Sequence, residues 1–152
     1  MNIEFEFSFK PINNQELETF EDTFNLILPN DYKNFLLYHN GGKAVRRRFE
    51  TKDKRITSSI MLFLPLSKET EKNLEYYYKK YNIEKIIPSN FIPFGVDPAD
   101  SLICLSINGE DQGTVYFCDL DYFEEDNGLK QEYIKLVSPS FSEFLNSLFQ
   151  PD

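Results

Sequence analysis

Tryptophan is absent from this sequence of 152 residues, histidine occurs once and cysteine occurs twice. The two cysteines, Cys104 and Cys118, form no CxxC pair. They are too few for a disulfide scaffold or a structural zinc site, so we expect two buried thiols. With His39 as the one histidine, a metal site would have to consist of carboxylates, and the spacing of an EF-hand is missing. We therefore expect no metal and no other cofactor.

The signatures of common enzyme classes are also missing. The sequence has no GxSxG, Walker A, HExxH or GxGxxG motif. A cysteine nucleophile would need His39 as its base, but both cysteines fall in strand patterns, where packed thiols are common. His39 ends a helical pattern just before Asn40 and Gly41, a position from which histidine caps the last carbonyls. The sequence therefore predicts a protein that is not an enzyme and has no catalytic residues.

Long apolar runs are missing as well. No run approaches the length of a membrane span. The first ten residues, MNIEFEFSFK, alternate apolar and polar side chains, whereas a signal peptide has a basic segment followed by an apolar block. We expect a cytoplasmic protein without a membrane partner.

Acidic residues are in excess, and they are unevenly distributed. The formal net charge is −9; residues 43–55, KAVRRRFETKDKR, have a net charge of +5, and residues 97–132 have a net charge of −9. Because an acidic face repels nucleic acid and attracts basic molecules, we expect no nucleic-acid partner. We interpret residues 43–55 as a mobile loop that pairs with the acidic face of the same molecule, with phosphate binding as the alternative.

The apolar residues, 41% of the chain, suffice for one core, and we predict one domain over residues 1–152. Alternating Ile and Phe predict a half-buried strand over residues 3–9. Asn13, with Glu16 three residues later, is a typical helix start. In the segment LPNDYKNFLLYHNGG, residues 28–42, we expect Asn30 to cap a second helix.

Strands dominate the second half of the predicted fold. Ser67 is the expected start of a third helix, and Ser140 with Glu143 forms a capping box for the last one. Pro93 places its strand at an edge or a bend of the sheet. Short turns join the later strands, which predicts an α+β fold with about four helices around a mainly antiparallel, twisted sheet. The later strands are expected over residues 60–66, 91–95, 101–107, 113–120 and 132–138.

The acidic segment DLDYFEED, residues 119–126, allows three interpretations. Its five carboxylates could bind a metal or act as an acid and base, but a solvated acidic loop is the simpler interpretation and we prefer it to a metal site. A protein-binding surface is as well supported as plain solvation. Tyr122 and Phe123 lie among the carboxylates, and aromatic anchors with charged neighbours are typical of protein recognition.

The segment LPNDYKNFLLYHNGG resembles the Leu-Pro-x-x-Tyr-x-x-Phe-Leu…Asn-Gly-Gly signature of the SUKH superfamily, which includes the Smi/Knr cell-wall-assembly regulators. Residues 91–121, FIPFGVDPADSLICLSINGEDQGTVYFCDLD, are similar to a later block of that family. Residues 138–149, SPSFSEFLNSLF, are similar to its closing helix. The resemblance runs in family order over residues 17–149. Its structural motif corresponds here to Leu28, Pro29, Tyr32, Phe35, Leu36, Asn40, Gly41, Gly42, Pro93, Phe94 and Gly113.

The resemblance implies a SUKH-like α+β fold without enzymatic activity. Many bacterial members are immunity proteins that bind a toxin, commonly a nuclease or deaminase, in the cytoplasm. The alternative that it implies is a regulatory interaction module of the Smi/Knr type with no toxin partner. For the first function we expect a basic partner protein, steered by an acidic surface with two aromatic contacts. That expected surface consists of Asp97, Asp100, Glu110, Asp111, Asp119, Asp121, Tyr122, Phe123, Glu124, Glu125 and Asp126.

Overall fold

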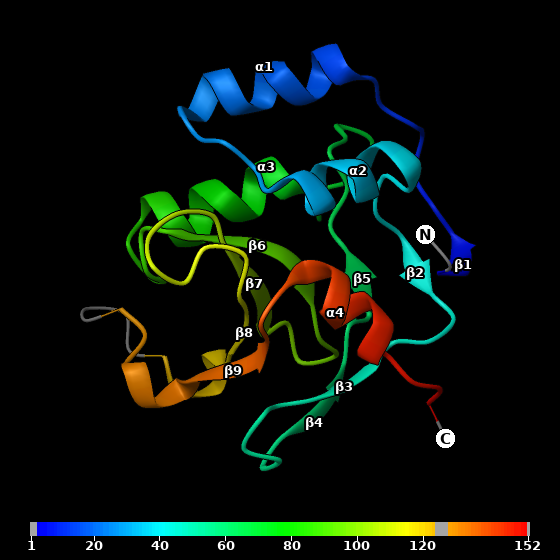
Figure 1. Ribbon diagram of the computed structural model, residues 1–152. Helices are drawn as coiled ribbons and strands as arrows, with labels where there is room; N and C mark the ends of the chain where they lie inside the picture. Colours follow the sequence, from blue (N-terminus) through cyan, green and yellow to red (C-terminus); the bar gives the residue numbers. More distant parts are fainter. Residues whose placement is uncertain (1–2, 124–127, 152) are drawn as a thin grey trace.

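Five antiparallel strands form the central sheet, in the order β5-β6-β7-β8-β9. The structure, a computed structural model, describes residues 3–123 and 128–151 (Figure 1). Four α-helices accompany the sheet in the described part of the chain, so the predicted α+β class is confirmed. The elements are β1 (Phe5–Phe7), α1 (Asn14–Phe24), α2 (Asn30–Tyr38), β2 (Lys43–Ala44), β3 (Arg48–Glu50), β4 (Thr57–Ser59), β5 (Leu62–Phe63), α3 (Leu74–Tyr77), the π-helix η1 (Tyr78–Ile83), β6 (Phe91–Val96), β7 (Leu102–Ser106), β8 (Val115–Cys118), the 3₁₀ turns η2 (Leu120–Tyr122) and η3 (Gln131–Tyr133), β9 (Ile134–Ser138) and α4 (Phe141–Ser147).

Two small antiparallel sheets extend this arrangement, β1 with β2 and β3 with β4. The first joins the central sheet through Gly42 and Phe63, whose backbone N–H groups each donate to the other residue's carbonyl, at 2.9 and 2.8 Å. The second contacts the edge strand β9 where the Lys52 N–H donates to the Leu136 carbonyl at 2.8 Å. Both edges of the central sheet therefore carry a neighbouring segment, which limits pairing with another chain.

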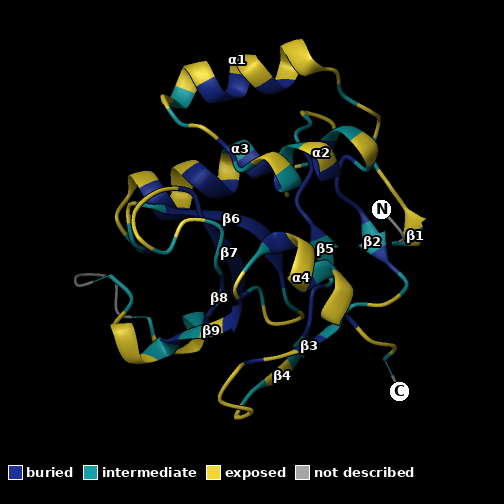
Figure 2. Cartoon of the chain, viewed as in Figure 1, coloured by how far each residue is buried: buried dark blue, intermediate teal, exposed yellow. Residues whose placement is uncertain are grey.

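Aromatic side chains fill the core between α2, α4 and the sheet. Tyr32 packs against Phe94 and Phe141, with ring centroids 5.9 and 5.0 Å apart, and Phe35 lies 5.1 Å from Phe141. Phe94 also meets Phe144 at 5.5 Å in an edge-to-face arrangement, a favourable geometry for aromatic pairs. Figure 2 shows the central strands in the colour of buried residues.

Two helix starts confirm the predicted caps. The side chain of Asn13 accepts a hydrogen bond from the Glu16 N–H at 2.9 Å, and Ser140 accepts one from the Glu143 N–H at 3.0 Å. The predicted cap of α2 is off by one residue. Asn30 is the first helical residue, and the proline before it has extended backbone angles.

The third helix begins later than predicted. Asn73, not Ser67, caps α3, and its side chain accepts from the Tyr76 N–H at 2.8 Å. Ser67 instead closes a local turn by accepting from the Glu69 N–H at 3.0 Å. The apolar stripe of the helix begins at Leu74. A helix that began six residues earlier would have had no apolar side chains to bury in its first turns.

Pro93 does not place its strand at an edge of the sheet. β6 is an internal strand between β5 and β7, and each of its six residues is buried. The sheet tolerates the proline because β5 pairs with β6 only at Gly95 and Val96, beyond Pro93, while pairing with β7 shifts register between Pro93 and Gly95.

Residues 43–55 do not form the predicted loop. They contain β2 and β3, whose strand partners lie far away in the sequence or beyond the next turn. Their ion pairs also differ from the prediction. Lys43 and Arg47 each lie 3.5 Å from Glu6, and Asp53 lies 3.5 Å from Lys135. Within the described ranges, no ion pair joins a basic residue of this stretch to residues 97–132.

The hairpin of β7 and β8 and the strand β9 confirm the strands predicted over residues 101–107, 113–120 and 132–138, although β1 and β5 are shorter than their apolar patterns. Among the described residues, no helix has both the length and the apolar character that crossing a membrane requires.

Candidate partner-binding surface

The sheet separates the expected acidic surface into two groups. Asp97 and Asp100 lie in the turn before β7, while Glu110 and Asp111 lie in the turn after it. Because β8 runs back antiparallel to β7, Asp119 returns to the first end. The Leu120 N–H there donates to the Ser101 hydroxyl at 3.0 Å. The five residues of β7 hold the two groups about 17 Å apart at roughly 3.3 Å per residue, so they do not form one continuous patch.

Two of these carboxylates stabilise the turn between β6 and β7. Asp97 accepts hydrogen bonds from the Ala99 and Ser101 N–H groups at 3.0 and 2.8 Å, and from the Ser58 hydroxyl at 3.0 Å. Asp100 accepts from the Tyr77 hydroxyl at 3.0 Å, and burial together with this carboxylate raises the pKa of Tyr77. Both side chains are thus committed to contacts within the protein.

Asp111 has a similar role at the other end of the sheet. Its carboxylate accepts from the hydroxyls of Ser106 and Tyr116, at 2.8 and 2.7 Å, and from the Asn90 amide at 3.2 Å. Burial, reinforced by this carboxylate, raises the pKa of Tyr116 to about 12. The neighbouring Glu110 is exposed. This end therefore offers a partner one exposed carboxylate from the expected set.

An exposed aromatic side chain marks the end of the sheet that follows β8. Tyr122 is 57% exposed, and its ring lies almost parallel to that of Tyr133, with centroids 4.4 Å apart. Asp121 is exposed, Asp119 caps η2 by accepting from the Asp121 N–H at 3.1 Å, and Phe123 is half-buried. The predicted members Glu124, Glu125 and Asp126 lie outside the described residues.

Sequence reasoning missed Tyr133 and the exposed Glu132 before it. A signal was present, since Asp121-Tyr122 and Glu132-Tyr133 repeat the same carboxylate-tyrosine order on the two sides of one loop. Antiparallel pairing of β8 with β9 brings these two dipeptides together, and the Asp119 N–H donates to the Tyr133 carbonyl at 3.0 Å.

The Asn-Gly-Gly part of the family motif holds three chain segments together. Asn40 is 2% exposed, and its side-chain amide donates to the carbonyls of Lys10 and Leu66 at 2.9 and 3.0 Å. Its side-chain oxygen accepts from the Leu66 N–H at 2.8 Å. One side chain thus satisfies buried backbone groups on both sides of the exit of α2.

The two glycines that follow permit a close backbone crossing. Gly41 has φ +69°, and a Cβ there would lie 2.5 Å from the Phe63 carbonyl oxygen and 2.7 Å from the Pro65 nitrogen. Gly42 has φ +121°, and a Cβ there would collide with the Phe7 carbonyl oxygen. Only glycine fits between β1 and β5 in this conformation.

The remaining motif residues lie in the core or at turns. Pro29 is half-buried and directly precedes α2. Gly113 lies in a turn with φ +93°, and its N–H donates to the Ser106 carbonyl at 2.8 Å. Tyr32 is buried, and its hydroxyl has no hydrogen-bond partner in the described part of the structure. The buried members of the motif are Leu28, Tyr32, Phe35, Leu36, Asn40, Gly41, Gly42, Pro93 and Phe94.

The two cysteines considered as nucleophiles are buried, and the histidine considered as their base is half-buried. Cys104 and Cys118 are fully buried, which confirms two buried thiols; their sulfurs lie 3.8 Å apart, and burial raises the pKa of Cys104. His39 stacks on Phe5, with ring centroids 4.6 Å apart, and burial lowers its pKa. Over residues 3–123 and 128–151, no group of three or more Asp, Glu, His or Cys side chains could hold a metal ion.

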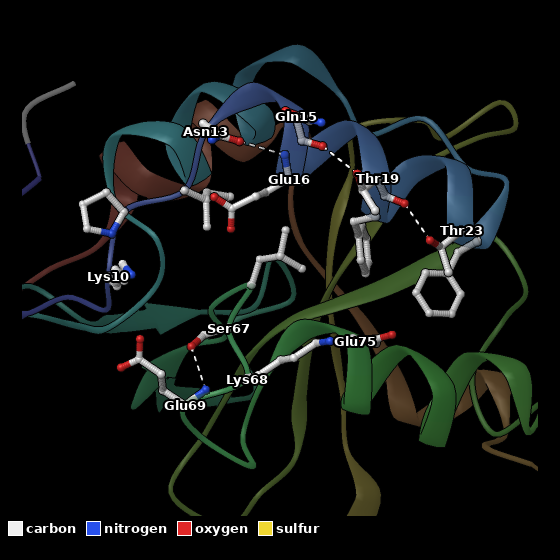
Figure 3. A pocket seen from close by; sticks show the side chains of 15 residues that line it. Lys10, Asn13, Gln15, Glu16, Thr19, Thr23, Ser67, Lys68, Glu69 and Glu75 are labelled. Atoms are coloured by element: carbon white, nitrogen blue, oxygen red, sulfur yellow. Dashed lines mark hydrogen bonds between the residues drawn. The ribbon is translucent and has the colours of Figure 1, made fainter.

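A groove of about 660 Å³ lies between α1 and residues 66–75 (Figure 3). Its polar groups are largely used within the protein. The hydroxyls of Thr19 and Thr23 donate to helix carbonyls at 2.8 and 2.7 Å, and Asn13 and Ser67 each accept from a nearby N–H. Glu16, Glu69 and Glu75 share the groove with Lys10 and Lys68, so neither sign of charge dominates it. The groove therefore shows no set of free polar groups aimed at one ligand.

Comparison with known proteins adds one finding. The model of the SMI1 / KNR4 family (SUKH-1) matches residues 11–147. No curated protein matches the chain.

Proposed function

The chain belongs to the SMI1 / KNR4 family (SUKH-1), and from this premise we propose that it is an immunity protein. It binds a cognate bacterial toxin in the cytoplasm and blocks it by covering its surface, without catalysing a reaction. The toxin presents a basic surface, as nucleases and other proteins that act on nucleic acid do.

The observation that carries this proposal is the exposed acidic and aromatic surface beyond β8. Tyr122, Asp121 and Glu132 are exposed there. The sequence of residues 119–133 contains six carboxylates and one lysine, a net charge of −5. Electrostatic potentials of opposite sign on two binding surfaces raise the association rate constant from about 10⁵–10⁶ to as much as 10⁸–10⁹ M⁻¹s⁻¹ at low salt. Fast capture suits a protein that has to neutralise a toxin inside the cell that makes it.

The packing of the reactive side chains supports a binding role rather than an enzymatic one. A buried thiol with a raised pKa is a poor nucleophile, and both cysteines are fully buried on adjacent strands. His39 packs between aromatic rings at the end of α2.

Affinity capture from the native host, followed by co-expression, tests the proposal directly. We expect a captured basic protein that inhibits growth when produced alone, and restored growth when this chain is produced with it. Capture of several unrelated partners, none of which inhibits growth, would instead support the regulatory interaction module.

Charge reversal tests whether the end of the sheet beyond β8 meets the captured protein. Asp121→Lys should weaken binding and reduce its salt dependence, because Asp121 is exposed and no described residue forms an ion pair with it. Glu18→Lys changes the net charge equally on an exposed position of α1, far from this end of the sheet (Figure 1), and should leave the salt dependence near wild type. Equal effects of the two variants would show that only overall charge matters. Asp97, Asp100 and Asp111 are unsuitable for this test because each accepts a hydrogen bond from another residue of the protein.

A further inference from the structure

The stacked rings of Tyr122 and Tyr133, which we call the tyrosine pair, lie on a rigid base. β8 and β9 pair up to Cys118 and Ile134, and the Asp119 N–H continues the ladder by donating to the Tyr133 carbonyl at 3.0 Å. The 3₁₀ turns that carry the rings are each closed by a backbone hydrogen bond, from Phe123 to the Leu120 carbonyl at 3.1 Å and from Tyr133 to the Lys130 carbonyl at 3.0 Å. The rings are therefore carried by hydrogen-bonded turns that continue directly from the paired strands.

Tyr122 keeps more than half of its surface exposed beside its stacked partner. Tyr133 covers one face of the Tyr122 ring, with an angle of 10° between the ring planes, and Tyr122 remains 57% exposed. An exposed carboxylate stands immediately before each ring in the sequence, Asp121 before one and Glu132 before the other. The surface thus combines a flat aromatic face with two negative charges that no described residue neutralises in an ion pair.

This combination fits the side chain of arginine. A guanidinium group is planar, stacks on aromatic faces and binds carboxylates through two parallel N–H groups, whereas a lysine ammonium is a strongly hydrated point charge. We propose that the tyrosine pair is the anchor site for an arginine of the basic partner protein, stacked on Tyr122 and paired with Asp121 or Glu132. The inference rests on the proposed function and adds the residue type that the surface recognises.

A second exposed tyrosine on the same protein provides the contrast. Tyr76 is 51% exposed and also follows a carboxylate, Glu75, but the Lys80 ammonium already lies 5.8 Å from its ring centroid, and Glu75 pairs with Lys79 at 3.5 Å. Within the described ranges, no lysine or arginine lies over the ring of Tyr122 in this way. Tyr76 therefore serves as a matched control whose cation site is already filled.

The test uses two labelled peptides that differ only in having three arginines or three lysines in a glycine-serine background. Their binding to the full chain is measured by fluorescence anisotropy at low salt. We expect the arginine peptide to bind wild-type protein several-fold more tightly than the lysine peptide, and Tyr122→Ala to weaken arginine binding about fivefold and remove this preference. Asp121→Asn should weaken both peptides, and Tyr76→Ala should change neither. Circular dichroism of each variant checks that the fold is retained.

Equal binding of the two peptides to wild-type protein, or an arginine preference that survives Tyr122→Ala, would overturn the inference. These outcomes are separable from failure of the proposed function. A captured toxin whose affinity is unaffected by Tyr122→Ala keeps the proposed function and removes the arginine anchor. An arginine preference that depends on Tyr122, with no toxin captured, keeps the anchor and removes the immunity role.

Discussion

Replacing Asn40 by alanine should be among the most damaging single changes to this fold. The substitution removes three hydrogen bonds of 2.8–3.0 Å and leaves the Leu66 N–H and two carbonyls without this partner at a site that is 2% exposed. Each bond contributes about 1 kcal/mol, and a buried group left unsatisfied costs about 1–3 kcal/mol. We therefore expect the free energy of unfolding to fall by about 3–4 kcal/mol, a large share of the roughly 5–15 kcal/mol that is usual for a domain.

Urea denaturation followed by far-ultraviolet circular dichroism measures this change. The midpoint should fall while the slope with denaturant stays constant, because the amount of surface exposed on unfolding is unchanged. Asn40→Asp separates hydrogen bonding from packing, since it keeps the shape and the acceptor for Leu66 but replaces the amide donor by an oxygen facing two carbonyls. We expect it to destabilise the fold at least as much as Asn40→Ala.

Asn34→Ala supplies the control. Asn34 is an exposed residue of the same helix, α2, so its replacement should change stability by about 0.5 kcal/mol or less, in the stabilising direction, through helix propensity. A loss below about 1 kcal/mol for Asn40→Ala would refute the reasoning, because it would mean that the three bonds do not hold the segments around α2 together.

Three further predictions concern buried groups. Tyr32→Phe should leave the melting temperature unchanged or raise it, because the hydroxyl is buried without a partner among the described residues, and a marked loss would reveal a hidden partner. Gly42→Ala should cost about 3 kcal/mol or more in urea denaturation, since a Cβ there collides with the Phe7 carbonyl and the backbone has φ +121°. Cys104 and Cys118 should resist a thiol reagent such as Ellman's in the native protein and react in denaturant, and rapid native reaction would contradict their burial.

Local signals in the sequence predicted local structure well. The caps at Asn13 and Ser140 depend on residues three positions apart, and both hydrogen bonds are present. The start of the third helix was wrong because Ser67 and Asn73 are both good caps. Only the apolar stripe that begins at Leu74 distinguishes them.

Features that depend on distant partners were harder to predict. The strand β2 pairs with β1 near the start of the chain, and nothing in the basic sequence of residues 43–55 indicates that partner. Likewise, the length of β7 and the return of β8 decide that Glu110 lies away from Asp121, although both belong to one acidic stretch of sequence. The tyrosine pair could have been anticipated only by aligning the two sides of the β8–β9 loop.

The two halves of α1 differ in their tertiary contacts, and this difference affects local unfolding of the helix. Its second half is fastened by Phe20 and Phe24, whose rings meet Tyr78, and by Glu21, which accepts from the Leu28 N–H at 2.8 Å. The groove of Figure 3 runs along the whole helix, from Gln15 to Phe24, so these contacts of the second half, and not the groove, distinguish it from the first turns. Amide protons at the start of this helix should therefore exchange with deuterated solvent earlier than those near Phe24, through fraying that leaves the aromatic core closed.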